Sequence, residues 1–437
     1  MTTRYLADAV VTVDQADSIY RPGALDVEAG RVSWVGDPAS APPAPPDVVH
    51  LGGVVMPGLV NTHGHTPMTL LRSAGDGLPL DRWLREVVWP REAHASDEDV
   101  YWGMRLGCDE LLSGGVTTTC EQYAHGRGLL EAVHEAGIRC VLTPAVFDIP
   151  GAGPEGTWQY MVSEAYALHR DHNDPGGLVT VGIGPHSVYA LPAEALLSVA
   201  ELAATTGGLI QIHVAETVQE GRLVKEAHGC SAPAVLERLG VLEHAVLAAH
   251  SVWLSDADLD IYATHDVAVA HCPQSNGKLG SGVARVADMR SRGIRVGLGT
   301  DGPASNDNLD LWEELRLAPL LARAVSADPA ALGTKEALRL ATRGGAEALG
   351  LDAGCLEPGR PADFIRLDGD DPVFVPMLDD ADLLAHLVWA ASSRLVTDVW
   401  VAGRQLVRGG TTMPAESAEA RRQVASRARR LRDASLA

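Results

Sequence analysis

Apolar residues follow two different patterns along this chain. Between residues 5 and 55 they form short runs of β type separated by turn residues, and no helical periodicity appears. This spacing predicts strands over 9–13, 24–27, 32–35 and 48–54. The interval from 37 to 47 contains so many prolines that we expect an exposed loop within a small sheet.

The β pattern returns near the end of the chain. Residues 362–368 and 396–407 are predicted as strands, the second stretch containing a hairpin-like Ala-Gly turn. Neither stretch resembles the middle of the chain, so we expect one small β-sandwich domain assembled from both ends. Residues 415–436 are rich in Ala and Arg with helical periodicity, which predicts a solvated packing helix.

In the middle of the chain, strand-like runs alternate with amphipathic helix-like runs, a pattern typical of parallel β/α units. Eight strands are predicted, over 54–60, 117–120, 139–146, 180–184, 209–214, 245–249, 267–270 and 295–298. Helices are predicted over 96–113, 128–136, 193–206 and 308–324. The expected fold class is α/β, with a (β/α)₈ TIM barrel over 57–358 and the β-sandwich formed by 1–56 and 359–437. The length of 437 residues fits a barrel of ~250 residues plus a smaller domain.

Charge and cysteine usage exclude several classes of protein. A formal net charge of −22 argues against a general nucleic-acid binder, which needs clustered Lys and Arg. The six cysteines form no Cys-X-X-Cys pair, which indicates reduced thiols and a cytoplasmic protein. The first residues lack the pattern of a signal peptide, and no apolar run approaches the ~20 residues of a membrane span. We therefore expect no membrane partner.

Candidate chemistry begins at His63-Gly-His65, at the end of an apolar run. Alternate side chains of a strand point to the same face, so the two histidines point the same way. Two imidazoles that converge from one strand end can fill half of the shell of one small metal ion. An isolated His-X-His is more often a surface or core pair, so the pair alone does not decide the matter.

Further ionisable residues follow the predicted strands. They are His186 after strand four, His213 and Glu216 after strand five, His250 after strand six and Asp301 after strand eight. The active site of a (β/α)₈ barrel lies at these strand ends. Together with His63 and His65 after strand one, ionisable residues therefore follow five of the eight predicted strands. Such a pattern is hard to obtain by chance, which favours a shared site.

These residues carry a resemblance to a known family. The set His63-X-His65, His213-X-X-Glu216, His250 and Asp301 in Gly-Thr-Asp-Gly resembles the amidohydrolase superfamily, in its deaminase/chlorohydrolase branch. The similarity extends over nearly the whole chain and includes the stretches 57–63, 271–276 and 358–363.

The resemblance implies one Zn²⁺ per chain, with Fe²⁺ as the alternative, held by His63, His65, His213 and Asp301. Relatives with two metals bridge them by a carboxylated lysine or a glutamate. No lysine precedes Lys225, and His186 stands at the end of strand four. A single ion is therefore expected.

The resemblance also implies catalytic roles for Glu216, His250 and Asp301. A bound ion lowers the pKa of its water, and Asp301 accepts the water proton. Protonated Glu216 donates to a ring nitrogen, and His250 hydrogen-bonds the attacking oxygen. This is hydrolytic deamination of a heteroaromatic C–NH₂ group.

The loop after strand one, residues 70–92, resembles that of S-adenosylhomocysteine/methylthioadenosine-type deaminases. The resemblance implies that Trp83 lines the pocket for base and ribose and that Glu92 accepts the ribose hydroxyls, with His186 beside them. Ordinary positions on a helix face are the alternative for Trp83 and Glu92. Family members that bind the homocysteine carboxylate use arginines near strand three, where this chain has 143–145 and the Gly/Pro-rich 151–156. Smaller or apolar 5′ groups are therefore favoured, unless Arg72, Arg85 or Arg91 substitutes.

The expected function is hydrolytic deamination of adenosine, 5′-deoxyadenosine, methylthioadenosine or S-adenosylhomocysteine to the inosine analogue and ammonia. The alternatives are a free-base deaminase for guanine, 8-oxoguanine or cytosine, a triazine-type hydrolase, and a catalytically silent binding protein. Glu216 favours deamination over chloride displacement, and retention of all the ligands argues against a silent protein. The resemblance further implies a homo-oligomer with a small-molecule partner only. The sequence leaves open the 5′ substituent, the native metal, the oligomeric state and the pathway.

Overall fold

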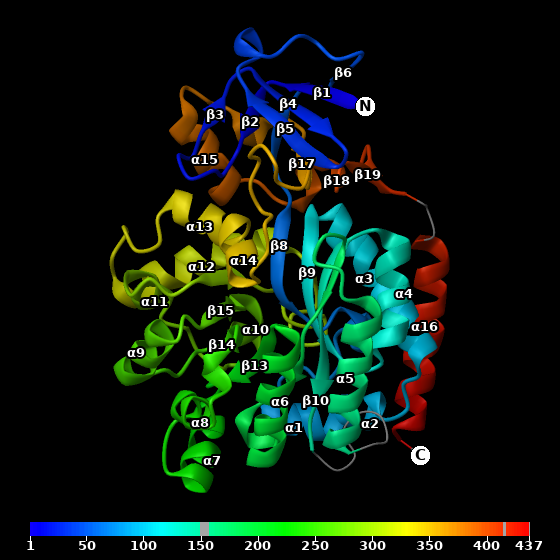
Figure 1. Cartoon of the computed structure of the whole chain (residues 1–437), viewed down its shortest axis with the longest axis vertical. Coiled ribbons are helices and arrows are strands. Elements are labelled where there is room, and N and C mark those ends of the chain that lie inside the picture. Colours follow the sequence, from blue (N-terminus) through cyan, green and yellow to red (C-terminus); the bar gives the residue numbers. More distant parts are fainter. Residues whose placement is uncertain (149–156, 414–416, 437) are drawn as a thin grey trace.

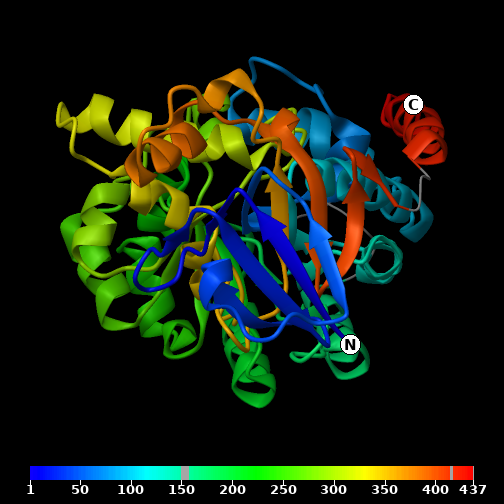
Figure 2. The same cartoon turned by 90° about the horizontal axis from the view of Figure 1, so that it is seen from above.

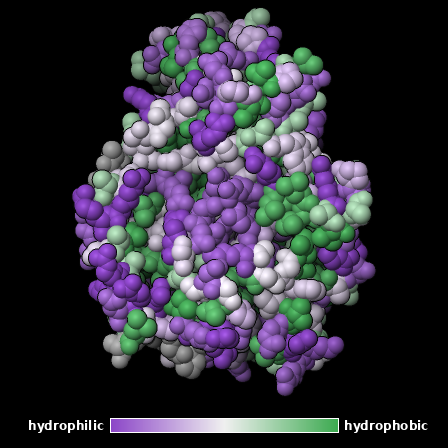
Figure 3. All heavy atoms as spheres, turned by 180° about the vertical axis from the view of Figure 1, so that it is seen from behind, coloured by the Kyte–Doolittle hydropathy of each residue, from purple (hydrophilic) through white to green (hydrophobic). Residues whose placement is uncertain are grey.

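The computed structural model describes residues 1–148, 157–413 and 417–436 of the chain. Helices surround the strands of the central region, and strands from the two ends of the sequence gather at one end of the molecule (Figure 1). The content is mixed α/β. Figure 3 shows that one face of the molecule carries polar residues over much of its area, with apolar patches between them.

Eight of the strands run parallel in the central region, in two sheets. The first sheet contains β8 (Leu59–Gly64), β9 (Val116–Tyr123), β10 (Arg139–Val146) and β11 (Val179–Val181), with the short β12 (Gly184–Pro185) also paired to β10. The second contains β13 (Ile210–Val214), β14 (Val246–His250), β15 (Ala268–His271) and β16 (Val296–Leu298). Isolated parallel bridges from Gly64 to Asp301 and from Ile183 to Ile210 join the sheets at both seams, as a closed ring of strands requires.

The helices of the central region lie outside these strands (Figures 1 and 2). They are α3 (Asp97–Ser113), α4 (Gly126–Ala136), α5 (Trp158–His172), α6 (Ala193–Thr206), α7 (Val218–His228), α8 (Ala232–Arg238), α9 (Asp256–Thr264), α10 (Pro273–Lys278), α11 (Val286–Ser291), α12 (Leu311–Ser326), α13 (Thr334–Leu340) and α14 (Arg343–Ala348). The boundaries follow local chemistry: Ser96 and Asp99 form a capping box that begins α3, and Gly137, in the left-handed region at φ +75°, ends α4.

Strands from both ends of the chain share one sheet. Its order is β20 (Thr411–Thr412), β19 (Arg404–Arg408), β18 (Val396–Val401), β17 (Phe364–Leu367), β7 (Val54–Pro57), β2 (Ala9–Val11) and β3 (Ile19–Tyr20). A second sheet contains β5 (Arg31–Gly36), β4 (Gly23–Glu28), β1 (Thr2–Ala7) and β6 (Asp47–His50). A separate apolar cluster that includes Leu25, Val55 and Phe364 draws on strands of both sheets. The rings of Phe364 and Trp400 stack within it at 4.4 Å.

Two further helices belong to the C-terminal part of the chain. The helix α15 (Asp380–Trp389) packs against α12 and α13, and α16 (Ser417–Ala434) packs along α3. The predicted C-terminal helix is therefore present over 417–434, and the remaining residues of that prediction include 415 and 416, which lie outside the described residues. No helix in the described part of the chain is long and apolar enough to span a membrane.

The prediction of a first barrel strand over 54–60 is wrong in its boundaries. The chain makes two strands there, β7 in the sheet of the chain ends and β8 in the parallel sheet. Gly58 separates them, and a Cβ at this residue would lie 2.1 Å from Oγ1 of Thr117 on β9. The close approach of β9 therefore requires glycine at the crossing point. The predicted strand over 48–54 is likewise divided, between β6 and the start of β7.

Candidate metal centre

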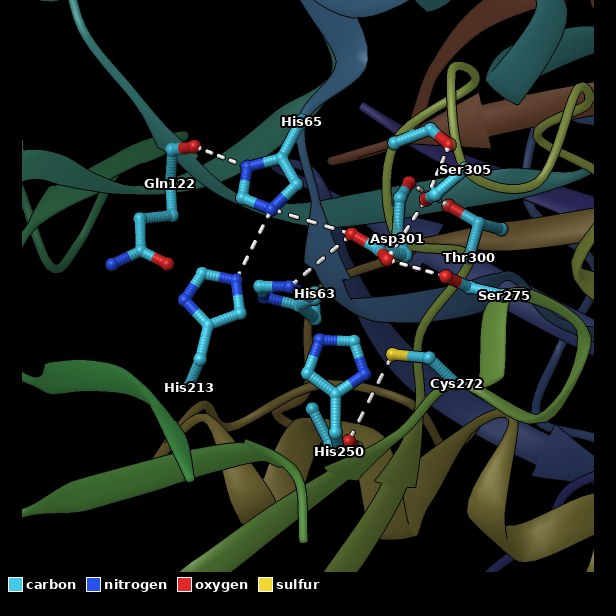
Figure 4. Close-up of polar contacts among 12 residues, drawn as sticks. His63, His65, Gln122, His213, His250, Cys272, Ser275, Thr300, Asp301 and Ser305 are labelled. Carbon is cyan, nitrogen blue, oxygen red and sulfur yellow. Dashed lines mark hydrogen bonds and ion pairs between the residues drawn. The ribbon is translucent and has the colours of Figure 1, made fainter. Parts of the chain in front are cut away.

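Three histidines and one aspartate meet at the carboxyl ends of three strands (Figure 4). His63 and His65 lie at the end of β8, His213 lies near the end of β13, and Asp301 follows β16. Oδ1 of Asp301 lies 3.5 Å from Nε2 of His63 and 3.3 Å from Nε2 of His65. Nε2 of His213 lies 3.3 Å from Nε2 of His65. The potential ligand atoms of His63, His65 and His213 lie within 4.8 Å of one another, as do those of His63, His250 and Asp301.

Hydrogen bonds at the far side of two rings fix which nitrogen faces this cluster. Nδ1 of His65 lies 2.5 Å from the carbonyl oxygen of Gln122, and Nδ1 of His213 lies 2.8 Å from that of His186. A carbonyl only accepts, so both Nδ1 atoms carry the proton and donate it. In the neutral rings, each Nε2 therefore presents a lone pair to the cluster, as metal ligation requires.

His63 is the most enclosed of these side chains. Its Nε2 is buried without a hydrogen-bond partner among the described residues, and its Nδ1 contacts the side-chain amide of Gln211. Burial lowers the pKa of His63 to about 4, so the ring is neutral at physiological pH. A buried, unpartnered nitrogen is costly unless something binds it. Three imidazole nitrogens and one carboxylate form a donor set that zinc accepts, so the residues present fit a metal ion.

Two hydroxyl groups hold the carboxylate of Asp301 in place, and its backbone has an unusual conformation. Ser275 Oγ and Ser305 Oγ donate to Asp301 Oδ2 at 2.6 and 2.9 Å. Burial alone would raise the pKa of Asp301, but the neighbouring histidines, His63 foremost, hold it well below its usual range. The residue also has φ +59°, a conformation that costs energy for any residue but glycine. The surrounding structure thus maintains a charged carboxylate in a strained position.

Glu216 and His250 form a second layer beside the cluster. Oε2 of Glu216 lies 3.8 Å from Nε2 of His250, and Ser281 Oγ donates to Oε1 of Glu216 at 3.4 Å. Burial raises the pKa of Glu216, which favours the protonated form that can donate. Burial lowers the pKa of His250, but the nearby carboxylates of Glu216 and Asp301 outweigh it and raise the pKa.

Neighbouring side chains orient this pair. The carboxylate of Glu220 accepts from the backbone N–H groups of Ala215 and Glu216 at 2.8 and 2.7 Å, which fixes the turn that carries Glu216. Nδ1 of His250 lies 2.9 Å from Oδ1 of Asn276. These hydrogen bonds, with Glu220 and Asn276, orient the side chains of Glu216 and His250 toward the cavity that both of them line.

A cavity opens over the cluster. His65, His213, Glu216, His250 and Asp301 line it, together with the three residues expected to contact the substrate: Trp83, Glu92 and His186. The empty volume, mouth included, is about 980 Å³. The structure therefore brings all the predicted site residues to one place, with His63 behind the wall of the cavity.

The predicted substrate loop is helical where it covers the cavity. It contains α1 (Leu80–Trp83), a π-helical turn (Leu84–Val88) and α2 (Trp89–Glu92). Trp83 Nε1 donates to the carbonyl of Ala74 at 2.7 Å, which fixes the indole against the cavity wall. The π turn is a geometry that occurs frequently at functional sites.

The histidine beside this helical segment is neutral. Burial lowers the pKa of His186 to about 3, and its Nδ1 lies 3.1 Å from Ser187 Oγ. A neutral imidazole has one donor and one acceptor nitrogen, so it can pair with a hydroxyl group or with a base edge.

Arg72, Arg85 and Arg91, which could have substituted for the arginines near strand three, are not among the described residues that line the cavity. Arg72 is engaged by Glu110 at 2.6 Å, Arg85 is exposed, and Arg91 is half-buried. Thr143 and Pro144 are buried in β10, and Ala145 contributes an apolar wall. The Gly/Pro-rich stretch 151–156 lies outside the described residues.

Several residues that support the site were not singled out from the sequence. They are Gln122, Tyr123, Gln211, Glu220, Ser281 and Ser305. The predicted strand over 117–120 stops at the first acidic residue, whereas β9 continues to Tyr123, with Glu121 and Gln122 buried. Buried polar residues that continue a strand toward a predicted active site were the available signal.

Comparison with known proteins places the chain among enzymes. The model of the amidohydrolase family matches residues 54–406. The chain is 42% identical over 400 residues to a 5-methylthioadenosine/S-adenosylhomocysteine deaminase of Pelotomaculum thermopropionicum, covering 90% of each chain. It is 39% identical over 394 residues to a 5′-deoxyadenosine deaminase of Methanothermobacter thermautotrophicus, covering 89% of this chain and 90% of the relative. It superposes with a TM-score of 0.93 and 32% identity on an adenosine deaminase from Xanthomonas campestris with bound zinc, covering 99% of this chain and 98% of that one.

Proposed function

The chain belongs to the amidohydrolase family, and we propose that it is a zinc-dependent hydrolytic deaminase that converts an adenosine-type nucleoside to the inosine analogue and ammonia. It is a hydrolase of C–N bonds, in line with the deaminases to which it is similar. The observation that carries the proposal is the position of Glu216, a buried acid with a raised pKa, in one cavity with the His/Asp cluster and Glu92. This cavity combines a metal site, a proton donor and a carboxylate suited to a diol.

We propose one zinc ion per chain, held by His63, His65, His213 and Asp301, with Fe²⁺ as the alternative. When bound, the ion would lower the pKa of a water molecule in the cavity toward neutrality. The orientation of the Nε2 atoms and the charged state of Asp301 support this ligand set. The solved relative with bound zinc supports the identity of the metal.

The proton transfers can be assigned to the residues of this chain. Asp301 accepts the proton of the attacking water, because it is held as a carboxylate. Glu216 holds a proton and donates it to the ring nitrogen beside the carbon that carries the amino group. His250, fixed by Asn276, hydrogen-bonds the attacking oxygen. The proton on Asp301 then passes to the amino group, which departs as ammonia, and the remaining proton of the attacking oxygen returns to Glu216 as the carbonyl of the product forms.

Trp83, Glu92 and His186 bind the nucleoside in this proposal. Glu92 accepts the ribose hydroxyls, His186 pairs with a ribose oxygen or the base edge, and Trp83 packs against the base and sugar. Ala145 and Phe147 are among the apolar residues that line the cavity, and no arginine of the described residues lines it. Adenosine, 5′-deoxyadenosine and methylthioadenosine therefore fit the lining better than S-adenosylhomocysteine, whose carboxylate would find no cationic partner there.

We interpret the eight parallel strands as a closed (β/α)₈ barrel over 57–358 and the two remaining sheets as a β-sandwich built from 1–56 and 359–437. The bridges at both seams of the parallel sheets and the shared apolar cluster of the end sheets support this division. The cytoplasmic location and the homo-oligomeric state stay predictions.

Ammonia release from a panel of compounds tests the proposal. The purified enzyme is incubated with adenosine, 5′-deoxyadenosine, methylthioadenosine, S-adenosylhomocysteine, guanine and cytosine. The proposal predicts turnover of nucleosides, with kcat/KM for S-adenosylhomocysteine below that for methylthioadenosine. Turnover of free bases alone would contradict it.

A further inference from the structure

Tyr123 is a buried residue of the cavity to which the proposed chemistry gives no role. It is the last residue of β9, its side chain is only 7% exposed, and it lines the cavity. Its hydroxyl group donates to Oε1 of Glu92 at 2.7 Å. Burial and the adjacent Glu92 raise the pKa of Tyr123 well above its usual value, so the phenol keeps its proton.

Glu92 depends on this hydrogen bond for its orientation. It lies at the end of α2, a helix of only four residues that directly follows the π turn. Among the described residues, Tyr123 is the one hydrogen-bond partner of the Glu92 carboxylate. The bond occupies Oε1 and leaves Oε2 without a partner in that part of the chain. A glutamate held at one oxygen presents the other in a fixed direction.

The neighbouring residue on β9 links this bond to the metal centre. The carbonyl of Gln122 accepts from Nδ1 of His65 at 2.5 Å, and the side chain of the next residue holds Glu92. β9 is buried over its whole length and paired with β8 and β10 on either side. A single rigid strand therefore sets the distance between a proposed metal ligand and the proposed sugar-binding carboxylate.

We propose that Tyr123 is a positioning residue for sugar recognition. It holds the Glu92 carboxylate so that a nucleoside with both the 2′- and the 3′-hydroxyl group is selected over nucleosides that lack one or both of them. The inference rests on the proposed function, because it assumes a nucleoside in the cavity. Two hydroxyl groups can reach a carboxylate whose orientation is fixed, whereas a free glutamate would lose that geometry and the selectivity with it.

Substrates that lack the hydroxyl groups separate this role from simple packing. Steady-state kinetics of the zinc-loaded enzyme and its Tyr123→Phe variant are measured with adenosine, 2′-deoxyadenosine, 3′-deoxyadenosine and 2′,3′-dideoxyadenosine. We expect Tyr123→Phe to raise KM for adenosine about tenfold, the loss of one hydrogen bond to a charged group. KM for the dideoxy compound should change less than about twofold, because it has no hydroxyl group to place. The kcat for adenosine should stay within about threefold, since the proton carriers are untouched.

A matched control exists on the surface of the same protein. Tyr101 donates to Oε2 of Glu135 at 2.6 Å, a bond of the same kind outside the cavity. Tyr101→Phe should leave KM unchanged for all four nucleosides. If Tyr123→Phe folds poorly, Tyr123→Leu provides a second deletion of the hydroxyl group. The comparison uses KM values, which do not depend on the fraction of active enzyme.

The outcomes distinguish this inference from the proposed function. Equal increases in KM for adenosine and dideoxyadenosine, or no increase for either, would overturn the role of Tyr123 and leave the deaminase assignment intact. Failure of the unaltered enzyme to deaminate any of these nucleosides would overturn both. A selective loss for adenosine supports both.

Discussion

Replacement of Glu216 by glutamine removes the proposed proton donor while preserving its shape. The Glu216 side chain receives one long hydrogen bond, from Ser281 Oγ at 3.4 Å, and an amide oxygen can still accept it. The turn is held instead by the bonds from the backbone to Glu220. We therefore expect Glu216→Gln to change the free energy of unfolding by less than about 1 kcal/mol.

The effect on catalysis should be far larger. General acid catalysis by a positioned side chain contributes about 10²- to 10⁴-fold, so kcat for adenosine should fall by that factor, or about 2.7 to 5.5 kcal/mol of activation free energy. Zinc content and KM should stay close to those of the unaltered enzyme, because Glu216 is placed outside the ligand set. The assay follows the absorbance change from adenosine to inosine, with metal analysis and urea denaturation of the same samples.

Two results would refute this reasoning. A Glu216→Gln variant with kcat within about threefold of the unaltered enzyme would exclude Glu216 as the proton donor. A variant that loses its zinc would show that Glu216 supports the ligands. Ser281→Ala is the matched control, since it removes the hydrogen bond to Glu216 but keeps the acid, and should lower kcat only slightly.

Three further predictions address the other parts of the site and one part of the scaffold. Asp301→Asn should lower kcat at least about 10²-fold and weaken zinc retention, measured by metal analysis after dialysis; normal zinc content with normal kcat would contradict its two roles. Glu92→Gln should raise KM for adenosine while hardly changing that for 2′,3′-dideoxyadenosine, and an equal effect on both would exclude ribose contact. The buried carboxylate of Asp99 accepts hydrogen bonds from Arg427 and Arg430. Burial alone would raise its pKa, but these hydrogen bonds and those from Ser96 outweigh burial and lower the pKa to about 2. A carboxylate with a depressed folded-state pKa stabilises above its unfolded pKa, so Asp99→Asn should cost about 2 kcal/mol at pH 7. The difference from the unaltered protein should shrink as pH falls below about 4 toward 2; a gap in urea denaturation that is unchanged at low pH would contradict this.

Much of the site could be predicted from sequence because the ionisable residues stand at the ends of apolar strands. Periodicity located the strands, and the barrel geometry implies that their ends meet, so His213 and Asp301 could be joined to His63 and His65 across more than a hundred residues. The boundary of the first strand could not be predicted, since Gly58 interrupts an apolar run that is continuous in sequence.

The supporting residues escaped prediction for a different reason. Tyr123 and Gln122 act through a hydroxyl group and a backbone carbonyl, whose partners depend on the packing of β9 against the helical segment above it. Polar residues also signal the end of a strand, so the buried Glu121 concealed the last part of β9. The segment from 80 to 92 was expected as a loop, but its apolar residues pack over the cavity as short helical turns.

The central claim is that the four residues at the strand ends hold one catalytic metal ion. Its most direct test is to strip the enzyme with a chelator, restore zinc in steps, and measure bound zinc and adenosine deamination in each sample. The account predicts negligible activity without metal and a linear rise that ends at one zinc ion per chain, with His63→Ala binding none. Full activity in the metal-free protein, or a rise that continues to two ions per chain, would contradict it.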